Sequence, residues 1–236
     1  VEVITGTKVK TVKGSKNGGF VNLENSKKIA ADAVLLAVGR RLNTSIEGIE
    51  VLNLDIERGR IATNGSMRTN VKNIFAVGDV TGKSLLASVA YCQGLVAARS
   101  CAGEEQEMNY DVIPSCIFTF PEIAAVGITE QQAKERGLKV RVGKFPFSAV
   151  GRSLADGSGE GFVKIVSGYD DGRIYGCHIA GGNAGEILSE VTLAMSRGLK
   201  VKDIAEAVHI HPTLSEGVME SALAVYGLSP HIPLKK

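Results

Sequence analysis

The sequence lacks the cysteine spacings from which metal sites and redox pairs are built. Its four cysteines are Cys92, Cys101, Cys116 and Cys177, and none of them forms a Cys-x-x-Cys pair or another zinc-binding spacing. We therefore expect no metal site. Unpaired cysteines are typical of a reducing compartment, so we expect buried or half-buried free thiols in a cytoplasmic protein, or in the mitochondrial matrix of a eukaryote.

Long apolar runs and a strong charge of either sign are also missing. The longest clean apolar runs are about as long as residues 33–38, well below the roughly 20 residues that a membrane-spanning helix needs. The net charge is only +2, and no basic stripe alternates with aromatic residues as in nucleic-acid-binding proteins. We therefore expect neither a membrane nor a nucleic acid as partner. With 44% apolar residues in a chain of 236, the composition is that of a globular protein of one or two domains.

The first 39 residues predict a β-meander. Residues 8–12 and 20–24 have the composition of strands and are joined by a glycine-rich turn. The continuous apolar run at residues 33–38 is typical of a strand buried inside a sheet. Residues 1–4 already alternate like a strand without an initiator methionine, so we interpret the chain as part of a longer polypeptide.

A short apolar segment that ends in Gly78-Asp79 is a second pattern of interest. Residues 74–77 predict a strand, and a helix is expected to begin near Ser84. The glycine would allow a ligand to approach the backbone closely, and a carboxylate at the end of a strand can accept hydrogen bonds from sugar hydroxyls. An ordinary strand, turn and helix in an α/β layer would have the same residues, so this motif alone leaves both interpretations open.

The pattern changes near Asn109, where we expect a domain boundary. Beyond it, the apolar periodicity predicts an α+β fold, a mostly antiparallel sheet with helices packed on one side. Thr129 and Gln132 have the spacing of a capping box that opens a short helix ending at Gly137, and a longer helix is expected over residues 183–198. The expected strands lie at residues 113–120, 122–127, 139–147, 161–167 and 173–180.

Near the end of the chain, residues 209–216 read His-Ile-His-Pro-Thr-Leu-Ser-Glu. Thr213 and Glu216 have the spacing of a capping box at the start of a helix, and Pro212 favours an extended conformation for His211. A histidine held near a carboxylate is also what a general base at neutral pH needs, because the carboxylate orients the ring and stabilises its protonated form. The residues alone fit both a helix cap and a catalytic pair.

Residues 209–216 resemble the C-terminal signature of the flavin disulfide reductases, the class I pyridine nucleotide-disulfide oxidoreductases, and above all of their dihydrolipoamide dehydrogenase branch. Residues 121–127, Pro-Glu-Ile-Ala-Ala-Val-Gly, and residues 144–152 resemble this family as well. Val150 departs from the branch, which usually has asparagine at this position. The resemblance extends over essentially all 236 residues and corresponds to the C-terminal half of such an enzyme.

The resemblance implies a catalytic pair. His211 would be the acid/base and Glu216 its partner, whereas His209 is assigned no chemistry. The histidine would take a proton from the substrate thiol, because the thiolate is the nucleophile in disulfide exchange. It would serve the redox disulfide of the other subunit of a dimer.

The resemblance also implies a contact with flavin. The Gly78-Asp79 segment would be the second FAD motif of the family, with Asp79 on the ribityl chain. Leu86 and Ala87 would lie against the pyrimidine edge of the flavin. A helix N-terminus at that place stabilises the negative charge of a reduced flavin.

Domain organisation and partners follow from the same resemblance. Residues 1–39 would be the tail of an NAD-binding domain, residues 40–108 the last segment of the FAD-binding and central domains, and residues 109–236 the dimerisation domain. The whole enzyme would use FAD and NAD and form a homodimer. Its substrate would be the dihydrolipoyl domain of a 2-oxo acid dehydrogenase complex.

Two features of the family are absent from the sequence, the FAD loop Gly-x-Gly-x-x-Gly and the redox pair Cys-x-x-x-x-Cys. We therefore predict that this chain by itself has no dehydrogenase activity and holds FAD and NAD poorly. Two alternatives stay open. One is a non-catalytic dimerisation or interaction module, and the other is a different member of the family, such as glutathione reductase or a soluble transhydrogenase.

Overall fold

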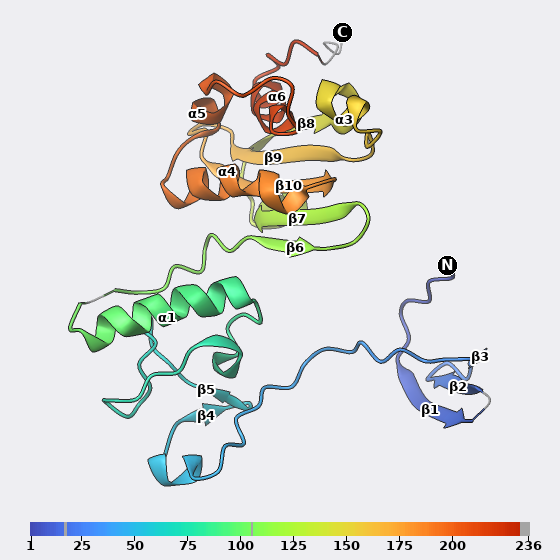
Figure 1. The fold of residues 1–236 in the computed structure, drawn as a ribbon, viewed down its shortest axis with the longest axis vertical. Coiled ribbons are helices and arrows are strands. Elements are labelled where there is room, and N and C mark those ends of the chain that lie inside the picture. The colour runs from blue at the N-terminus through green and yellow to red at the C-terminus, as the bar shows by residue number, and fades with distance from the viewer. Residues whose placement is uncertain (17, 105, 232–236) are drawn as a thin grey trace. The chain divides into compact units, whose positions relative to one another are not determined.

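The computed structural model describes residues 1–16, 18–104 and 106–231. The chain folds as two compact units, Val1–Leu42 and Asn43–Lys236 (Figure 1). The first unit is an antiparallel sheet whose strands follow the order of the chain: β1 (Val9–Ser15), β2 (Gly18–Leu23) and β3 (Lys28–Ala31). The two strands predicted at residues 8–12 and 20–24 are thereby confirmed.

The predicted third strand at residues 33–38 is wrong. These residues belong to no strand, and their apolar side chains are exposed, Leu35 to 90%. A strand buried in a sheet needs hydrogen-bonded neighbours and cover on both faces. The first unit offers only a small meander, in which β3 pairs with β2 at residues 28–31, so the apolar run has nothing to pack against within the described residues of this unit.

The second unit begins with short elements around one helix. Met67 is fully buried there against Val96 and Ala97 of that helix, with Phe75 and Tyr110 packed around them. The elements, with η for a 3₁₀ turn, are η1 (Ile49–Leu52), β4 (Ile56–Glu57), β5 (Arg60–Ile61), η2 (Gly78–Thr81) and α1 (Ala87–Cys101).

The expected strand at residues 74–77 and helix start at Ser84 are wrong. The amide of Thr69 donates to the carbonyl of Ile74, and the amide of Ala76 donates to the carbonyl of Met67. The chain turns back between these short segments, so their pairing reduces to an isolated bridge. The helix begins later, at Ala87, because η2 occupies the residues after the apolar segment and ends at Gly82, whose φ is 62°.

Within the second unit, residues 109–231 have the predicted α+β fold, with a five-stranded antiparallel sheet in the order β6-β7-β10-β9-β8 (Figure 1). Its strands are β6 (Ser115–Ile117), β7 (Glu122–Gly127), β8 (Val140–Pro146), β9 (Phe162–Gly168) and β10 (Ile174–Gly181). Its helices are α2 (Glu130–Glu135), α3 (Gly151–Ala155), α4 (Ala184–Ser196), α5 (Val201–Glu206) and α6 (Glu216–Val225), with a 3₁₀ turn, η3 (Phe147–Ala149), before α3. The capping box of Thr129 and Gln132 is confirmed at the start of α2.

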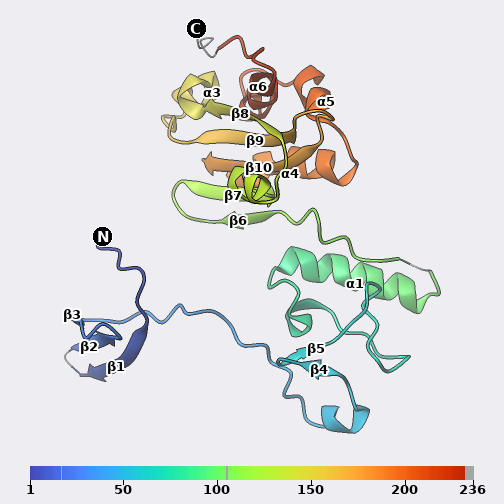
Figure 2. The ribbon, with the colours of Figure 1, turned by 180° about the vertical axis from the view of Figure 1, so that it is seen from behind.

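The core of this domain lies between the sheet and α4, α5 and α6. Ile165 of β9 and Cys177 of β10 are register partners that point into this core. The next pair along, Lys164 and His178, points to the other face, where Lys164 forms an ion pair with Glu130 of α2 at 2.6 Å. The expectation that all helices pack on one side is therefore wrong for α2, which Figure 2 shows on the face opposite α4.

Glu130 on that face makes the stability of the fold depend on pH. Hydrogen bonds from Lys134 and Lys164 and their charges lower the pKa of Glu130 from 4.5 to about 2. Because the folded-state pKa lies below the unfolded value, this carboxylate stabilises the fold above about pH 4.5, and the contribution is lost as the pH falls toward 2. We expect Glu130→Gln to lower the free energy of unfolding by about 1 kcal/mol at pH 7, and by less at pH 3.

Urea unfolding of both proteins at the two pH values measures this difference. Glu206→Gln is the matched control, because Glu206 pairs with Lys202 at 3.4 Å on the surface of α5, where both side chains are exposed. An equal loss of stability from Glu130→Gln at both pH values would contradict the assignment.

Candidate functional site

His211 and Glu216 form a hydrogen-bonded pair at the start of α6. The Oε1 atom of Glu216 accepts from Nδ1 of His211 at 2.8 Å, and its Oε2 atom accepts from the backbone N–H of Thr213 at 2.9 Å. Both carboxylate oxygens are thus held, one by the ring and one by the loop backbone. The imidazole is fixed at Nδ1, which leaves Nε2 as the acceptor of the neutral ring.

Only half of the predicted capping box is present. The carboxylate of Glu216 accepts the backbone N–H of Thr213, but the hydroxyl of Thr213 donates to the carbonyl of Ile210 at 2.7 Å. The reason is that α6 begins at Glu216 itself, after a turn at residues 214–215. Glu216 is therefore the first residue of the helix rather than the third, and the hydroxyl of Thr213 caps no amide of α6.

His211 is the solvent-accessible member of this pair, and Glu216 is the member held in place. The side chain of His211 is 78% exposed, whereas that of Glu216 is 18% exposed. Burial by itself would raise the pKa of Glu216, but the hydrogen bonds from His211 and Thr213 and the charges of His211 and His209 outweigh it, so the pKa lies below its usual value. The carboxylate therefore stays ionised through the neutral range beside an open imidazole.

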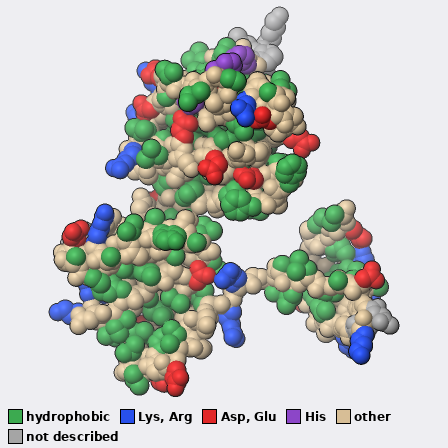
Figure 3. Space-filling view, in the orientation of Figure 1, with side chains coloured by type: hydrophobic (Ala, Val, Ile, Leu, Met, Phe, Trp, Pro, Cys, Tyr) green, Lys and Arg blue, Asp and Glu red, His purple; other side chains and the backbone are tan. Residues whose placement is uncertain are grey.

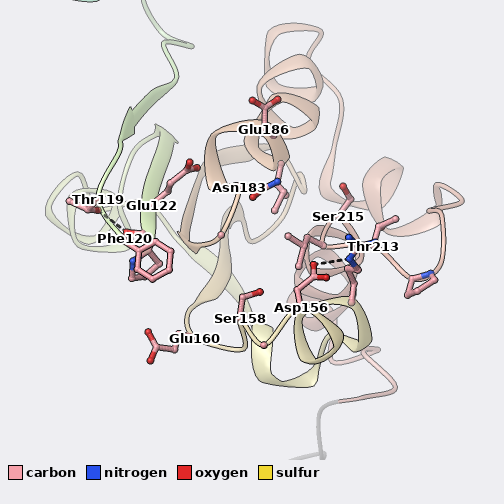
Figure 4. A pocket seen from close by; sticks show the side chains of 17 residues that line it. Thr119, Phe120, Glu122, Asp156, Ser158, Glu160, Asn183, Glu186, Thr213 and Ser215 are labelled. Carbon is pink, nitrogen blue, oxygen red and sulfur yellow. Dashed lines mark hydrogen bonds and ion pairs between the residues drawn. The ribbon is translucent and has the colours of Figure 1, made fainter.

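A pocket of about 870 Å³ lies beside this loop. Residues 212–215 line one part of it, and the turn at residues 119–122 lines another (Figure 4). Residues 152–160 and 182–187 contribute the rest. The charged side chains around it are mostly acidic, and Arg152 is engaged with Asp156 at 2.7 Å.

The residues predicted to contact flavin gather around η2 and α1. Gly78 is buried with a φ of 77°, and its N–H donates to Oε1 of Gln93 on α1 at 2.6 Å. Asp79, the next residue, is half-buried in η2. The residue before α1 is Leu86, whose side chain makes no capping hydrogen bond, so the first amides of α1 from Ala87 onward are not capped by it.

The groups at η2 and at the start of α1 could form hydrogen bonds with one side of a flavin. A carboxylate at η2 can accept hydrogen bonds from ribityl hydroxyls, and helix N-terminal amides can donate to the pyrimidine edge. Gly78 itself lies against α1, because a Cβ added at this position would lie 3.4 Å from the Cβ of Ala90, and its φ of 77° favours glycine. These residues lie around α1, and the His211 pair lies at the N-terminus of α6 in the sheet domain.

Sequence reasoning missed several residues that hold these groups in place. Gln93 is fully buried and donates to the hydroxyl of Tyr110 at 2.8 Å while it accepts from Gly78. His209 is bonded to Glu190 of α4 at 2.9 Å. No sequence signal links His209 to a residue 19 positions away.

The cysteines are all free thiols. Cys116 is half-buried and Cys177 is buried, as predicted, whereas Cys92 and Cys101 are exposed, contrary to prediction. Burial raises the pKa of Cys177 to about 12. Within the described residues, no cluster of three or more His, Cys, Asp or Glu side chains is arranged to bind a metal ion, and no helix has the length and apolarity to cross a membrane.

Comparison with known families gives two adjoining matches. Residues 1–94 match the family described as pyridine nucleotide-disulphide oxidoreductase, and residues 113–222 match the dimerisation domain of pyridine nucleotide-disulphide oxidoreductases. The chain belongs to this family.

Two similar relatives are dihydrolipoyl dehydrogenases. The chain is 46% identical over 203 residues to dihydrolipoyl dehydrogenase of Chlamydia muridarum, which covers 86% of this chain and 44% of the relative. It is 42% identical to dihydrolipoyl dehydrogenase of Bacillus subtilis, over 98% of this chain and 50% of the relative. The chain thus spans about half the length of the curated relatives it matches.

Solved structures agree on the fold. LpdA from Mycobacterium tuberculosis superimposes with a TM-score of 0.85 at 27% identity, over 92% of this chain and 48% of that one. The HOCl-induced flavoprotein disulfide reductase RclA from Escherichia coli superimposes with a TM-score of 0.81 at 26% identity, over 89% of this chain and 49% of that one.

Proposed function

We propose that the chain is the C-terminal half of a dihydrolipoyl dehydrogenase and supplies its acid/base pair. The observation that carries this proposal is the bond from Nδ1 of His211 to Glu216, which directs Nε2 of an exposed imidazole outward. The names of the relatives support the choice of branch over glutathione reductase or a soluble transhydrogenase.

In this proposal, His211 moves one proton per disulfide exchange. Its Nε2 takes the proton of a dihydrolipoyl thiol, and the resulting thiolate attacks a redox disulfide to give a mixed disulfide and a released thiolate. The ionised Glu216 stabilises the imidazolium that forms and keeps the ring from turning. The imidazolium returns this proton to the released thiolate, and Nε2 then takes the proton of the second dihydrolipoyl thiol. The second thiolate attacks the lipoyl sulfur of the mixed disulfide, which closes the lipoyl disulfide and releases the other enzyme thiolate, and this thiolate takes the proton from His211 to complete the enzyme dithiol.

Gly78, Asp79, Leu86 and Ala87 would hold the flavin side of the site. Asp79 would accept hydrogen bonds from the ribityl chain, and the amides at the start of α1 would donate to the pyrimidine edge. When bound there, FAD would supply two-electron transfer chemistry between a dithiol and NAD. We further propose that the enzyme works in the cytoplasm, or in the mitochondrial matrix if the source is eukaryotic.

A homodimer is part of the proposal. The match of residues 113–222 to a dimerisation domain supports it. So does the apolar surface at the β6–β7 end of the sheet, where Phe118 is 83% exposed and Ile117 60% (Figure 3). Exposed apolar clusters of this kind mark surfaces that another protein covers. The dihydrolipoyl domain of a 2-oxo acid dehydrogenase complex would be the substrate-bearing partner.

An assay of the 236-residue chain beside the full-length polypeptide tests whether the chain has activity by itself. With dihydrolipoamide and NAD, we expect NADH formation from the full-length protein and none from the chain alone, because its cysteines are not spaced as a redox pair. Turnover by the chain, with no full-length protein on a denaturing gel, would contradict this. Full-length protein that turns over glutathione disulfide instead would overturn the choice of branch.

The unpaired cysteines also favour a second candidate, a non-catalytic dimerisation module. The size of the native polypeptide separates the two. A band of roughly twice this length on a denaturing gel of source cells, probed with an antibody to this chain, supports the enzyme. A band at the size of this chain, together with a colourless and stable dimer in solution, supports the module.

A further inference from the structure

In the loop that carries His211, residues 208–210 alternate between exposed and buried side chains. The loop joins α5 to α6, and Val208 and Ile210 point into solvent at 101% and 78% exposure. His209 lies between them and points inward, with only 7% of its side chain exposed. Of the two histidines in this loop, the buried one is therefore His209, and the open one is His211.

Both ring nitrogens of His209 face acceptors. Nε2 lies 2.9 Å from Oε1 of Glu190 on α4, and Nδ1 lies 3.0 Å from the carbonyl oxygen of Ala207. A carbonyl oxygen and an ionised carboxylate can only accept. Both bonds therefore form together only when the ring carries a proton on each nitrogen, which makes the contact with Glu190 an ion pair as well as a hydrogen bond.

The loop depends on side chains for its attachment. Among the described residues, no backbone–backbone hydrogen bond is donated by the amides of residues 208–213. Thr213 and His211 bond to Glu216 of α6, and His209 bonds to Glu190 of α4. The loop is thus attached to two helices, and His209 is its anchor on α4.

The charges around this anchor come from three elements. Glu190 lies on α4 and Glu216 on α6, and the positive charge of His209 contributes to the lowered pKa of Glu216. Cys177 on β10 is near enough to Glu190 for the carboxylate to help raise the pKa of this thiol, after burial as the larger cause. Among these groups, His209 is bonded to Glu190 and also acts on the carboxylate of Glu216.

We propose that His209 and Glu190 are positioning residues for His211. They hold the loop against α4 so that the ring of His211 stays bonded to Glu216 through Nδ1 and presents Nε2 to the substrate. The inference rests on the proposed role of His211 as acid/base. His209 and Glu190 do not touch the reacting sulfur in this scheme, because His209 is buried and acts through the loop.

Nitrogen-15 NMR of the histidine rings tests the positioning without any turnover. The chain has four histidines, so their ring signals are few enough to assign one by one. In the unaltered chain, we expect His211 to be held in the Nδ1–H tautomer at neutral pH. In Glu190→Gln and in His209→Ala, we expect its signals to move toward the tautomer mixture of a free imidazole, while His178 and His231 keep their positions and report an intact fold.

Rescue and control variants separate positioning from general loss of structure. His209→Gln keeps an amide donor for Glu190. We therefore expect the ring signals of His211 to stay closer to those of the unaltered chain in His209→Gln than in His209→Ala. Glu206→Gln removes an exposed carboxylate from α5, one residue before the loop, and is expected to leave His211 unchanged. Unchanged His211 signals in both Glu190→Gln and His209→Ala would overturn the proposal.

Kinetics of the full-length enzyme give the second readout. We expect Glu190→Gln to lower kcat about tenfold with little change in KM, the lower end of the losses seen when a residue that orients a metal-binding histidine is removed. If the NMR signals shift as expected but His211→Gln leaves turnover intact, the positioning stands and the proposed role of His211 fails. If the signals do not shift but His211→Gln abolishes turnover, the proposed function stands and the positioning fails.

Discussion

Full-length protein with His211→Gln is expected to oxidise dihydrolipoamide on the order of 10²–10⁴ times more slowly than the unaltered enzyme. Glutamine can donate a hydrogen bond to Glu216 as the imidazole does at 2.8 Å, so the loop keeps that attachment. It cannot take a proton from a thiol at neutral pH, so the thiolate that attacks the disulfide is no longer formed by the enzyme. Steady-state rates across a range of dihydrolipoamide concentrations measure the loss, which should fall mainly on kcat.

His231→Gln provides a matched control for this experiment. His231 is also an exposed histidine, at 65%, and its Nδ1 bonds to a carboxylate of the same helix, Glu220, at 2.6 Å. Figure 3 shows histidine side chains at the surface near the C-terminal end of the chain. We expect His231→Gln to keep at least half of the turnover, because nothing in the proposed reaction uses it. Equal losses from the two substitutions would contradict a specific role for His211.

The bond between His211 and Glu216 could be predicted because the two residues are close in the sequence. His211 and Glu216 are five residues apart, so the loop and the first turn of α6 are enough to bring them together. The same short range explains the confirmed capping box at Thr129 and Gln132. It also explains the error at Thr213, since the spacing was right but the helix starts at Glu216, later than the spacing implied.

The strands of residues 109–231 were predictable for a different reason. Most of them alternate between a buried and a more open face, although β9 ends in a continuous buried run, and an antiparallel sheet preserves this alternation whatever the order of its strands. Residues 33–38 and 74–77 lack such a signal, because a continuous apolar run says only that burial is favourable, not that a neighbour is present. Both runs were assigned to strands and neither forms one.

Tertiary contacts between distant residues could not be predicted. Gly78 and Gln93, His209 and Glu190, and Glu220 and His231 are joined by bonds between separate elements. Each requires that two elements meet in one register, which no local pattern specifies. These contacts orient the predicted site residues, so the sequence indicates which groups are present and the fold determines how they point.

The position of α6, and with it Glu216, depends on one glycine in the sheet. Gly143 of β8 lies directly under α6, and a Cβ at this place would overlap the carbonyl oxygen of Ser221 and lie 2.7 Å from the amide of Val225. Both of these atoms belong to the helix backbone, which cannot move aside alone. A second contact fixes the same helix, because the hydroxyl of Ser221 donates to the carbonyl of Val163 on β9 at 2.9 Å.

We therefore expect Gly143→Ala to lower the free energy of unfolding by about 3 kcal/mol or more, the upper range for overpacking a core. The substitution forces α6 away from β8, so the bond between His211 and Glu216 should weaken with it. Urea unfolding measures the first effect, and the ring signals of His211 measure the second. Gly151→Ala is the control, because no atom lies within 4 Å of a Cβ added there, and its expected effect on stability is below about 0.5 kcal/mol. A Gly143→Ala protein as stable as this control would show that α6 can shift freely over the sheet, and the close packing would then not be what fixes Glu216.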